Sequence, residues 1–418
     1  MAILKTPMYS WHAAHGAHMG VFGGYAMPMW YGSVREEHLA VLTHAGIFDT
    51  SHMAVILVDG PGAFDLLQFC FTNDLTACLG RHKGPLKPGR AAYGAFLTAE
   101  GYVLDDAIVF MLAQTAFMVV VNAGMGPSVA RHLEHQRGNR QVRVIDLTGQ
   151  VGKIDVQGPL AARIMGEVLK APERVYDAMP YFAFKGSFHD RRPVHEPVFT
   201  ADGLPLLFSR TGYTGEFGFE ILATADAIAG VWEAIVAAGE RHGAVPCGLA
   251  ARDSLRAGAL LPLSHQDIGD WPFCRNPWTF ALPYLPGKKG FRKPFLGDSA
   301  LEPCRAPYTY PFVGRDLRKV TLPAEVRDGG GRVIGEVLTC VTDMAIGWHG
   351  GHIFSIASPD RPEDFKGGGL CCGFVKVSQQ QPPNTPLTLK DKRRQIDVIV
   401  VEDIRPARTA RQPILTML

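Results

Sequence analysis

Residues 209–220 read SRTGYTGEFGFE, a dozen positions that hold three glycines, two threonines, one tyrosine and two glutamates. Glycine lets a backbone turn tightly or come close to a ligand. If the stretch is a strand, Glu216 and Glu220 lie on one of its faces. A carboxylate accepts paired N–H donors from a flat heterocycle or from a guanidinium. Two interpretations remain open from these residues alone, a strand that binds a flat ring or a glycine-rich hairpin with solvated acids.

Composition narrows the class of protein. The chain has 418 residues, 47% of them hydrophobic and 20% charged, so it can bury large cores and should form two or three domains. Its 42 basic and 40 acidic residues leave a formal net charge of only +2. Such a chain has no overall field that would attract nucleic acid or an anionic membrane. We therefore expect a small molecule or a protein as its partner.

The N-terminal residues give no sign of export. MAILKTPMYSWHAAHG lacks an apolar stretch behind a basic start, which is what a secretory signal needs, and we expect a cytoplasmic protein. The apolar run 108–125 is interrupted by Gln114 and Asn122 and is rich in Val and Phe. This pattern predicts two strands that meet at a turn, not a membrane span.

Cysteine and histidine spacing does not indicate a metal centre. The eight cysteines form no CxxC pair, so we expect neither a zinc ribbon nor a disulfide framework, and most thiols should be reduced and buried. Alternation along a strand should send Cys371 and Cys372 to opposite faces of a sheet. His349 and His352, in WHGGH, would need further ligands to bind a metal, and none cluster nearby in the sequence. We predict no metal.

Strand-like and helix-like patterns alternate irregularly along the chain. A strand over 55–59 precedes a turn and an amphipathic helix, and a series of hairpins follows. Helical patterns cover 158–169 and 225–242. Pro, Lys and aromatic residues are enriched over 271–310, which predicts a domain joint, and the β-branched runs beyond it predict a compact all-β domain. The fold class is therefore α+β.

Two charged clusters stand out beside the glycine-rich stretch. Arg252 and Arg256 are four residues apart, on one face of a short helix in CGLAARDSLR, and this pair is either part of a binding site or a structural ion-pair network. Asp105 and Asp106 are adjacent in GYVLDDAIVF. Neighbouring residues of a strand point to opposite faces, so at most one of the two acids should enter a given pocket.

Together these stretches resemble the aminomethyltransferase family, which includes the T-protein of the glycine cleavage system and its tetrahydrofolate-dependent demethylase relatives. The agreement covers most of the first 270 residues in the family's order, and it rests on TPMYSWHAAHGAHMGVFGGYAMPMWYGSVREEHLAVLTHAGIFDTSHM, GPGAFDLLQFCFTNDL, the LDD hairpin, VVVNA, SRTGYTGEFGFEI and CGLAARDSLR. The resemblance implies an α+β, folate-binding aminomethyltransferase-like fold around a central channel. We expect a folate-binding region over 1–285, built from two interwoven subdomains, and a C-terminal all-β, barrel-like domain over 309–418.

The resemblance also implies which residues act. Asp106, the second acid of LDD, matches the family's catalytic aspartate beside a folate nitrogen, and Asp105 would then face away, although the choice between the two acids stays open. Glu220 matches the carboxylate that binds the N–H edge of the pterin ring. Such a reaction depends on positioning and on a carboxylate that stabilises developing positive charge or relays a proton. The other matched pocket positions are Met53, Tyr93, Asn122, Tyr213 and Arg252.

Three departures from the family concern the rest of the site. Where the family's arginine helix continues with Leu-Glu-Ala, this chain has Ala257, Gly258 and Ala259, so a carboxylate is lost. Phe110 replaces a tyrosine, which should remove a hydroxyl from the pocket rim. A long segment, 342–369, replaces a short turn. It either folds over the channel mouth, where Trp348, His349 and His352 would shape a different donor site, or is a solvent-exposed insertion.

Three hypotheses of function follow. The first is an aminomethyltransferase that moves a methylene group from an aminomethyl-lipoyl carrier protein to tetrahydrofolate and releases ammonia. The second is a stand-alone demethylase that moves a methyl group from a small O-, N- or S-methyl donor to tetrahydrofolate. The third is a folate-binding relative without catalysis. In each case the small-molecule partner is a folate, and neither nucleic acid nor a membrane is expected.

Overall fold

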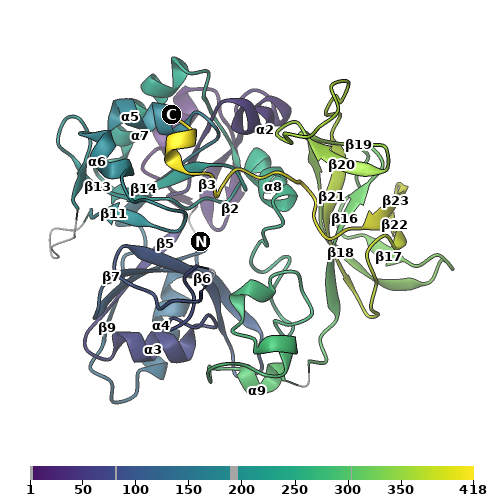
Figure 1. The fold of residues 1–418 in the computed structure, drawn as a ribbon, viewed down its shortest axis with the longest axis horizontal. Coiled ribbons are helices and arrows are strands. Elements are labelled where there is room, and N and C mark those ends of the chain that lie inside the picture. The colour runs from purple at the N-terminus through teal and green to yellow at the C-terminus, as the bar shows by residue number, and fades with distance from the viewer. Residues whose placement is uncertain (1–2, 81, 189–195, 303) are drawn as a thin grey trace.

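The computed structural model describes residues 3–80, 82–188, 196–302 and 304–418, and these form mixed helices and strands, as predicted. Two sheets lie one above the other on the left of Figure 1, and a closed barrel lies on the right. Within the described ranges, no helix is both long enough and apolar enough to cross a membrane.

The N-terminal part holds three sheets. A small sheet has the order β1-β3-β2, from Leu4–Lys5, Tyr25–Trp30 and His18–Phe22. The seven-stranded sheet comprises β4 (Gly46–Asp49), β10 (Val151–Gln157), β11 (Phe184–Gly186), β12 (Val198–Phe199), β13 (Pro205–Ser209), β14 (Gly218–Thr224) and β15 (Val245–Pro246). The five-stranded sheet, in the order β6-β7-β8-β5-β9, comprises β5 (Ala54–Asp59), β6 (Arg90–Leu97), β7 (Val103–Ala113), β8 (Ala116–Val121) and β9 (Arg143–Asp146).

Helices lie on the outer faces of the two larger sheets (Figure 1). The two larger sheets face each other across a shared apolar cluster that includes Val55 and Val120 from one sheet and Leu207 and Leu222 from the other. The chain enters the five-stranded sheet after β4 and leaves it before β10, so the two sheets are interleaved in sequence. The α-helices are α1 (Tyr9–Ala14), α2 (Val34–Thr43), α3 (Ala63–Cys70), α4 (Gly126–Gln136), α5 (Ala161–Val168), α6 (Pro172–Tyr176), α7 (Ile228–Glu240), α8 (Leu249–Gly258) and α9 (Asp298–Leu301).

The C-terminal part forms a closed six-stranded barrel, in the order β16-β21-β18-β17-β22-β23. The predicted β-rich composition past the joint is thus confirmed. The strands are β16 (Tyr308–Gly314), β17 (Glu325–Arg327), β18 (Val333–Asp343), β21 (Leu370–Val377), β22 (Pro386–Lys390) and β23 (Gln395–Val400). The segment before the barrel carries short 3-10 turns, at Thr279–Ala281 and Pro286–Lys288, and a third such turn, Ile414–Thr416, closes the chain.

Several predictions of local structure are confirmed. The apolar run 108–125 forms the end of β7 and the whole of β8, joined by a turn, and the predicted helices over 158–169 and 225–242 appear as the slightly shorter α5 and α7. Cys371 and Cys372 lie in different apolar clusters on the two sides of β21, as alternation requires.

The structure contains one disulfide that the cysteine spacing did not predict. Cys274 and Cys304 form a disulfide across the segment that joins the sheets to the barrel, while the other six cysteines are free. The two partners are 30 residues apart and belong to no CxxC motif, so spacing carried no signal for the pair. Only the folded path of the joint brings them together.

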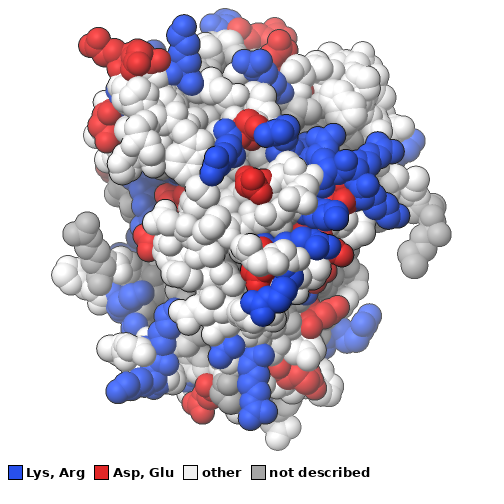
Figure 2. Space-filling model, turned by 90° about the vertical axis from the view of Figure 1, so that its right-hand side faces the viewer, with Lys and Arg blue, Asp and Glu red and all other residues white. Residues whose placement is uncertain are grey.

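The long segment 342–369 contains a two-stranded hairpin on the barrel. Its strands are β19 (Ile346–His349) and β20 (His352–Ser355), with His349 opposite His352. Nowhere in the described residues do three or more His, Cys, Asp or Glu side chains gather as they would around a metal ion. Trp348 donates its indole N–H to the carbonyl of Gly314 at 2.8 Å. It also lines a shallow depression of about 480 Å³ on the barrel, together with Arg315, Arg318 and Lys366. Figure 2 shows this side of the molecule, where Lys and Arg side chains gather.

The C-terminal tail ties the barrel to the sheets. Past β23 the chain leaves the barrel and runs back to the helices of the N-terminal part, drawn in yellow in Figure 1. Ile414 is buried there in the core beneath α5 and α7. On the way, the backbone N–H of Arg405 donates to the carbonyl of Gly258, and that of Ala410 donates to the carbonyl of Gly215.

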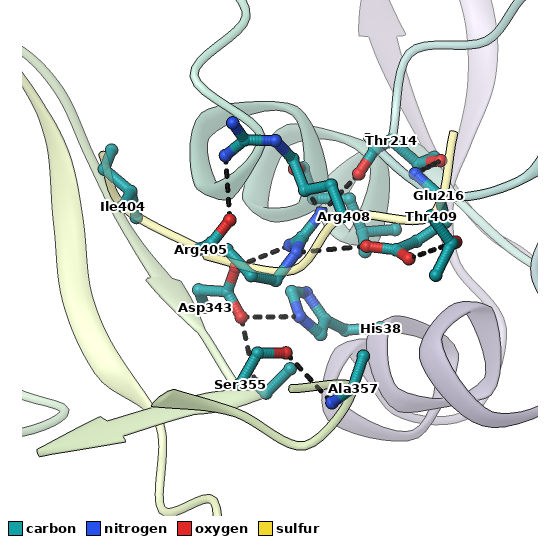
Figure 3. A network of polar contacts seen from close by, with 12 residues as sticks. His38, Thr214, Glu216, Asp343, Ser355, Ala357, Ile404, Arg405, Arg408 and Thr409 are labelled. Atoms are coloured by element: carbon teal, nitrogen blue, oxygen red, sulfur yellow. Dashed lines mark hydrogen bonds and ion pairs between the residues drawn. The ribbon is translucent and has the colours of Figure 1, made fainter. Parts of the chain in front are cut away.

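Arg405 is the centre of a buried ion network (Figure 3). Its guanidinium contacts the Asp343 carboxylate at 2.6 Å and the Glu216 carboxylate at 3.2 Å, and it donates to the carbonyl of Thr214. His38 of α2 reaches the other oxygen of Asp343 at 3.0 Å. Burial alone would raise the pKa of Asp343, but the charge of Arg405 and the contact with His38 hold that pKa well below its usual range.

Gly258 makes room for this network. A Cβ at position 258 would lie 1.9 Å from Oδ2 of Asp343 and 2.7 Å from Nη1 of Arg405, distances that no side chain tolerates. This is the position at which the resemblance led us to expect a glutamate. In this chain the space beside Gly258 holds the carboxylate of Asp343, from the end of β18.

We expect Asp343→Asn to destabilise the fold strongly. Removal of one partner of a buried ion pair leaves the other charge uncompensated, and the cost is about 3–5 kcal/mol. Urea unfolding at pH 7 measures it. Because the folded-state pKa of Asp343 is depressed, its contribution is present above the pKa of an unfolded aspartate and is lost as pH falls further, so the gap between wild type and variant should narrow below about pH 4.

The matched control is Asp316→Asn, which breaks an exposed pair with Arg318 on the same barrel. An exposed pair contributes about 1 kcal/mol at most. Equal unfolding free energies for the two variants would show that the Arg405 network does not hold the parts together.

Candidate functional site

The two predicted acids face the same space from opposite sheets. On β7, Ile108 lies two residues after Asp106 and Phe110 lies four residues after it. The side chains of Ile108 and Phe110 both pack in the apolar cluster between the sheets. Glu220 is two residues from Leu222 of the same cluster on β14. Since side chains alternate along a strand, Asp106 and Glu220 extend the two inner faces beyond that cluster. The site therefore lies next to the edge of the apolar cluster between the two sheets.

Asn122 holds both aspartates at once. Its side-chain N–H groups donate to Asp105 at 2.8 Å and to Asp106 at 2.7 Å, and its backbone N–H donates to Asp105 at 2.8 Å. Tyr93, on the neighbouring strand β6, donates its hydroxyl to Asp106 at 2.8 Å. Three of the predicted site residues, Tyr93, Asp106 and Asn122, thus form one hydrogen-bonded group.

The expectation that Asp105 faces away was wrong. Both carboxylates converge on the amide of Asn122 although the residues are adjacent. The register between β6 and β7 shifts at this point, since Phe96 pairs with Asp105 and Leu97 with Val103, which leaves Leu104 as an extra residue. A bulge of this kind interrupts alternation and redirects the side chains beside it.

Burial and mutual repulsion make the pair unusually basic. Burial and the nearby charge of Asp106 raise the pKa of Asp105 to about 7. Burial also raises the pKa of Asp106, although hydrogen bonds from Tyr93 and Asn122 oppose that change. Two close carboxylates that repel each other titrate as a unit. The pair can therefore hold one proton near neutral pH.

Glu220 belongs to a different electrostatic group, in which every acid meets a cation or a hydroxyl. Lys153 donates to Glu220 at 2.6 Å and to Asp155 at 2.5 Å, and Thr211 donates to the second oxygen of Glu220. Arg252 of α8 donates to Asp155 at 2.6 Å. Burial would raise the pKa of Asp155, but Lys153 and Arg252 together lower it.

Sequence reasoning missed Lys153 and Asp155. Both lie on β10, where VGKIDVQ places two charges at alternate positions of an otherwise apolar strand, and Asp155 is directly opposite Glu220 on β14. A charged residue is almost never fully buried unless it is paired. The alternating charges were the signal that could have identified them.

The expectation that Glu216 and Glu220 share one strand face was also wrong. Strand β14 begins only at Gly218, so Glu216 lies in the loop before it. There Glu216 binds Arg405 and accepts a hydrogen bond from Thr409, whereas Glu220 points toward Lys153. Gly215 turns this loop with a φ of +78°, a conformation that favours glycine. One acid of the opening stretch is structural and the other lies in the site.

Tyr213 lies between the two electrostatic groups. Its ring is 4.8 Å from the guanidinium carbon of Arg252, and its hydroxyl donates to the carbonyl of Pro262. Burial raises the pKa of Tyr213, and its surroundings include both Asp106 and Arg252. Met53 is partly buried against the apolar cluster between the sheets. Phe110 is buried in that cluster against Phe184.

These residues suit a flat, polar ring with N–H donors. Met53, Tyr93, Asn122 and Tyr213 each keep part of their surface accessible. Both oxygens of Asp106 and both oxygens of Glu220 accept hydrogen bonds from protein groups. Each carboxylate can still accept a hydrogen bond from a ligand, because it offers about four acceptor positions. The buried hydroxyl of Ser264 lies close enough to the two acids to lower the pKa of both Asp105 and Asp106.

Comparison with known proteins gives consistent matches. Residues 8–271 match the family described as the GCVT N-terminal domain. An aminomethyltransferase of Symbiobacterium thermophilum is 36% identical over 349 residues, which cover 81% of this chain and 85% of that protein. One from Geobacillus kaustophilus is 38% identical over 299 residues, 71% of this chain and 74% of that protein. The crystal structure of the glycine cleavage system aminomethyltransferase T from Bartonella henselae matches with a TM-score of 0.75 at 26% identity, over 98% of this chain and 99% of that chain.

We expect Asp105→Asn to stabilise the protein at alkaline pH. A carboxyl whose folded-state pKa is raised does not lower the free energy of unfolding at a pH below the pKa of an unfolded aspartate. Above about pH 7 it lowers the free energy of unfolding by the full amount. The amide removes that effect. Thermal unfolding should show a Tm a few degrees above wild type at pH 8.5, since 1 kcal/mol shifts the Tm of a chain of this length by roughly 1 °C, and a smaller gain at pH 5.

Asp74→Asn is the control of opposite sign. Hydrogen bonds from Thr76 and Gln68 outweigh the burial of Asp74 and lower its pKa, so loss of this charge should destabilise at pH 8.5. A lower Tm for Asp105→Asn at pH 8.5 would mean that the carboxylate pair is not under electrostatic stress.

Proposed function

The chain belongs to the aminomethyltransferase family, and from that membership we propose that it moves a methylene group from an aminomethyl-lipoyl carrier protein to tetrahydrofolate, with release of ammonia. A transferase of one-carbon metabolism needs an acceptor site and a group that manages charge and protons. The observation that carries the proposal is the pairing, across two facing sheets, of a carboxylate pair with a raised pKa and a cation-paired Glu220.

Tetrahydrofolate would supply the nitrogen that accepts the one-carbon unit. We assign its pterin edge to Glu220, held in place by Lys153 and Thr211. The remaining pocket positions are proposed to be Met53, Tyr93, Asn122, Tyr213 and Arg252. Tyr213 is stacked over Arg252, so a cation and an aromatic face are available together, which suits a conjugated ring.

Asp106 is the proposed catalytic residue. A carboxylate beside the acceptor nitrogen stabilises positive charge that develops there, and the effect is larger where water is excluded. Asp105 and Asp106 can exchange a proton near neutral pH because the pair titrates there. Asp105 is the alternative for the same role, since both acids bind Asn122.

We further propose that the two predicted regions have different functions. Region 1–285 would bind folate and carry the reaction, and region 309–418 would brace it. The contact of Arg405 with Thr214 and Glu216, on either side of the turn at Gly215, supports this division. The barrel would then act on the site through the loop that carries Tyr213.

The donor is tested by product analysis. Purified protein with tetrahydrofolate is supplied separately with a lipoyl carrier protein bearing the aminomethyl group and with a panel of O-, N- and S-methylated small molecules. We expect methylenetetrahydrofolate and ammonia, only with the carrier. Methyltetrahydrofolate from one free donor would contradict the proposal and make the protein a demethylase.

We expect Asp106→Asn to lose most turnover while folate binding persists. Loss of a positioned acid or base lowers kcat by about 10²–10⁴-fold. The amide keeps the shape and still accepts from Tyr93, so the Kd for tetrahydrofolate, measured by fluorescence titration, should change little. Asp316→Asn on the barrel is the control. Unchanged function in Asp106→Asn would favour Asp105 as the catalytic acid or, if Asp105→Asn is equally silent, a folate-binding protein without catalysis.

A further inference from the structure

A histidine outside the predicted site contacts the carboxylate pair. Nε2 of His265 is 3.9 Å from Oδ1 of Asp105. The two side chains differ sharply in exposure, 46% for His265 and 0% for Asp105. His265 therefore spans the distance between solvent and a buried acid that water cannot reach directly.

The loop that carries His265 is fixed on both sides of it. The buried carboxylate of Asp267 accepts from the backbone N–H of Leu263 at 2.9 Å and from Thr339 at 2.6 Å, and it pairs with Arg256. Gln266 donates to Thr339 at 2.7 Å. The turn is thus attached to both α8 and the barrel strand β18, and the imidazole is delivered from a rigid support.

The backbone at His265 is held in an unfavourable conformation. Its φ is +62°, in the left-handed region that residues other than glycine rarely adopt. Residues kept in such conformations cluster at functional sites, where the surroundings compensate the cost. The buried hydroxyl of Ser264, the preceding residue, lowers the pKa of the same two acids.

The other groups around the pair are not suited to exchange protons with solvent. Tyr93 of β6 and Tyr213 of the loop before β14 both have a pKa raised by burial, so each stays neutral. Arg256 is committed to Asp267 and Asp253. Histidine is the side chain whose charge changes most readily near neutral pH.

We propose that His265 is the proton-relay residue that connects the Asp105–Asp106 pair with solvent. The inference rests on the proposed function, because it assigns that pair a proton to exchange. In the relay, the half-exposed imidazole first moves from its 3.9 Å separation to hydrogen-bond distance of Asp105. The O–H bond of protonated Asp105 then breaks as an N–H bond forms at Nε2, and Nδ1 releases a proton to water. One proton leaves the pair, Asp105 becomes a carboxylate, and the neutral imidazole is restored. The reverse sequence reloads the pair.

The first test does not need catalysis. Carbon-13 NMR of labelled aspartate carboxyls, assigned with Asp105→Asn and Asp106→Asn, follows the pair through a pH titration in wild type and in His265→Asn. Asparagine tolerates the left-handed conformation, so the fold should persist. In the relay the imidazole carries the proton as a cation about 4 Å from Asp105, so its removal should raise the pKa of the pair by roughly half a unit. An unchanged titration overturns the proposal.

The second test uses chemical rescue. His265→Gly removes the imidazole and relieves the backbone at the same time. We expect kcat to fall roughly tenfold or more, with the alkaline and acid limbs of the pH profile displaced, and added imidazole to restore much of the rate. His352→Gly, at an exposed histidine of the barrel hairpin, is the matched control and should be neither slowed nor rescued.

The outcomes separate the two claims. A slow His265→Gly enzyme without imidazole rescue and with an unchanged carboxyl titration would assign His265 a purely structural role and overturn the relay. Wild-type protein that transfers no one-carbon unit to tetrahydrofolate from any donor would overturn the proposed function. A shifted carboxyl titration in that same protein would still establish that His265 is coupled to the pair.

Discussion

The buried guanidinium of Arg405 links the barrel, the C-terminal tail and the N-terminal sheets. It is fully enclosed, and a cation in that environment is stable only because Asp343 and Glu216 face it from the barrel and from the glycine-rich loop. His38 and Ser254 extend the network into α2 and α8. Each of these groups would be costly alone, so the barrel, the tail and the sheets must come together for any of them to be satisfied. The loop that carries Tyr213 takes its shape from this assembly.

The site contains two groups of acids that differ in their electrostatic surroundings. Around Glu220, the cations Lys153 and Arg252 keep Asp155 ionised, which gives a fixed charge pattern suited to recognition. Around Asp106, no Lys or Arg is paired with either acid in the described residues, and burial raises the pKa of both. A group that must gain and lose a proton has to titrate near the working pH, whereas a group that only binds must not. Tyr213 separates the two regions.

Local patterns in the sequence were sufficient for the class of fold, and the resemblance named three residues that the structure brings together. Alternating apolar runs predicted the β7–β8 hairpin, and the grouping of Tyr93, Asp106 and Asn122 followed from matching motifs. Contacts set by long-range folding were missed. The bulge at Leu104 turned Asp105 inward, strand pairing brought Lys153 to Glu220, and the path of the joint brought Cys274 to Cys304. None of these depends on spacing along the chain, so periodicity could not reveal them.

The position of Asp343 changes how the departures from the family should be weighed. The loss of a glutamate at Gly258 suggested an altered donor site, but the carboxylate of Asp343 occupies that space and binds Arg405. Phe110 is likewise buried between the sheets and contacts Phe184, away from solvent. Both changes are absorbed by packing and so say little about the donor. His265 differs from them, because it is half exposed, its backbone is strained, and it contacts one of the two acids that the reaction would use. Chemical differences within this family are better sought in the residues that reach the carboxylate pair from solvent than in the residues that brace it.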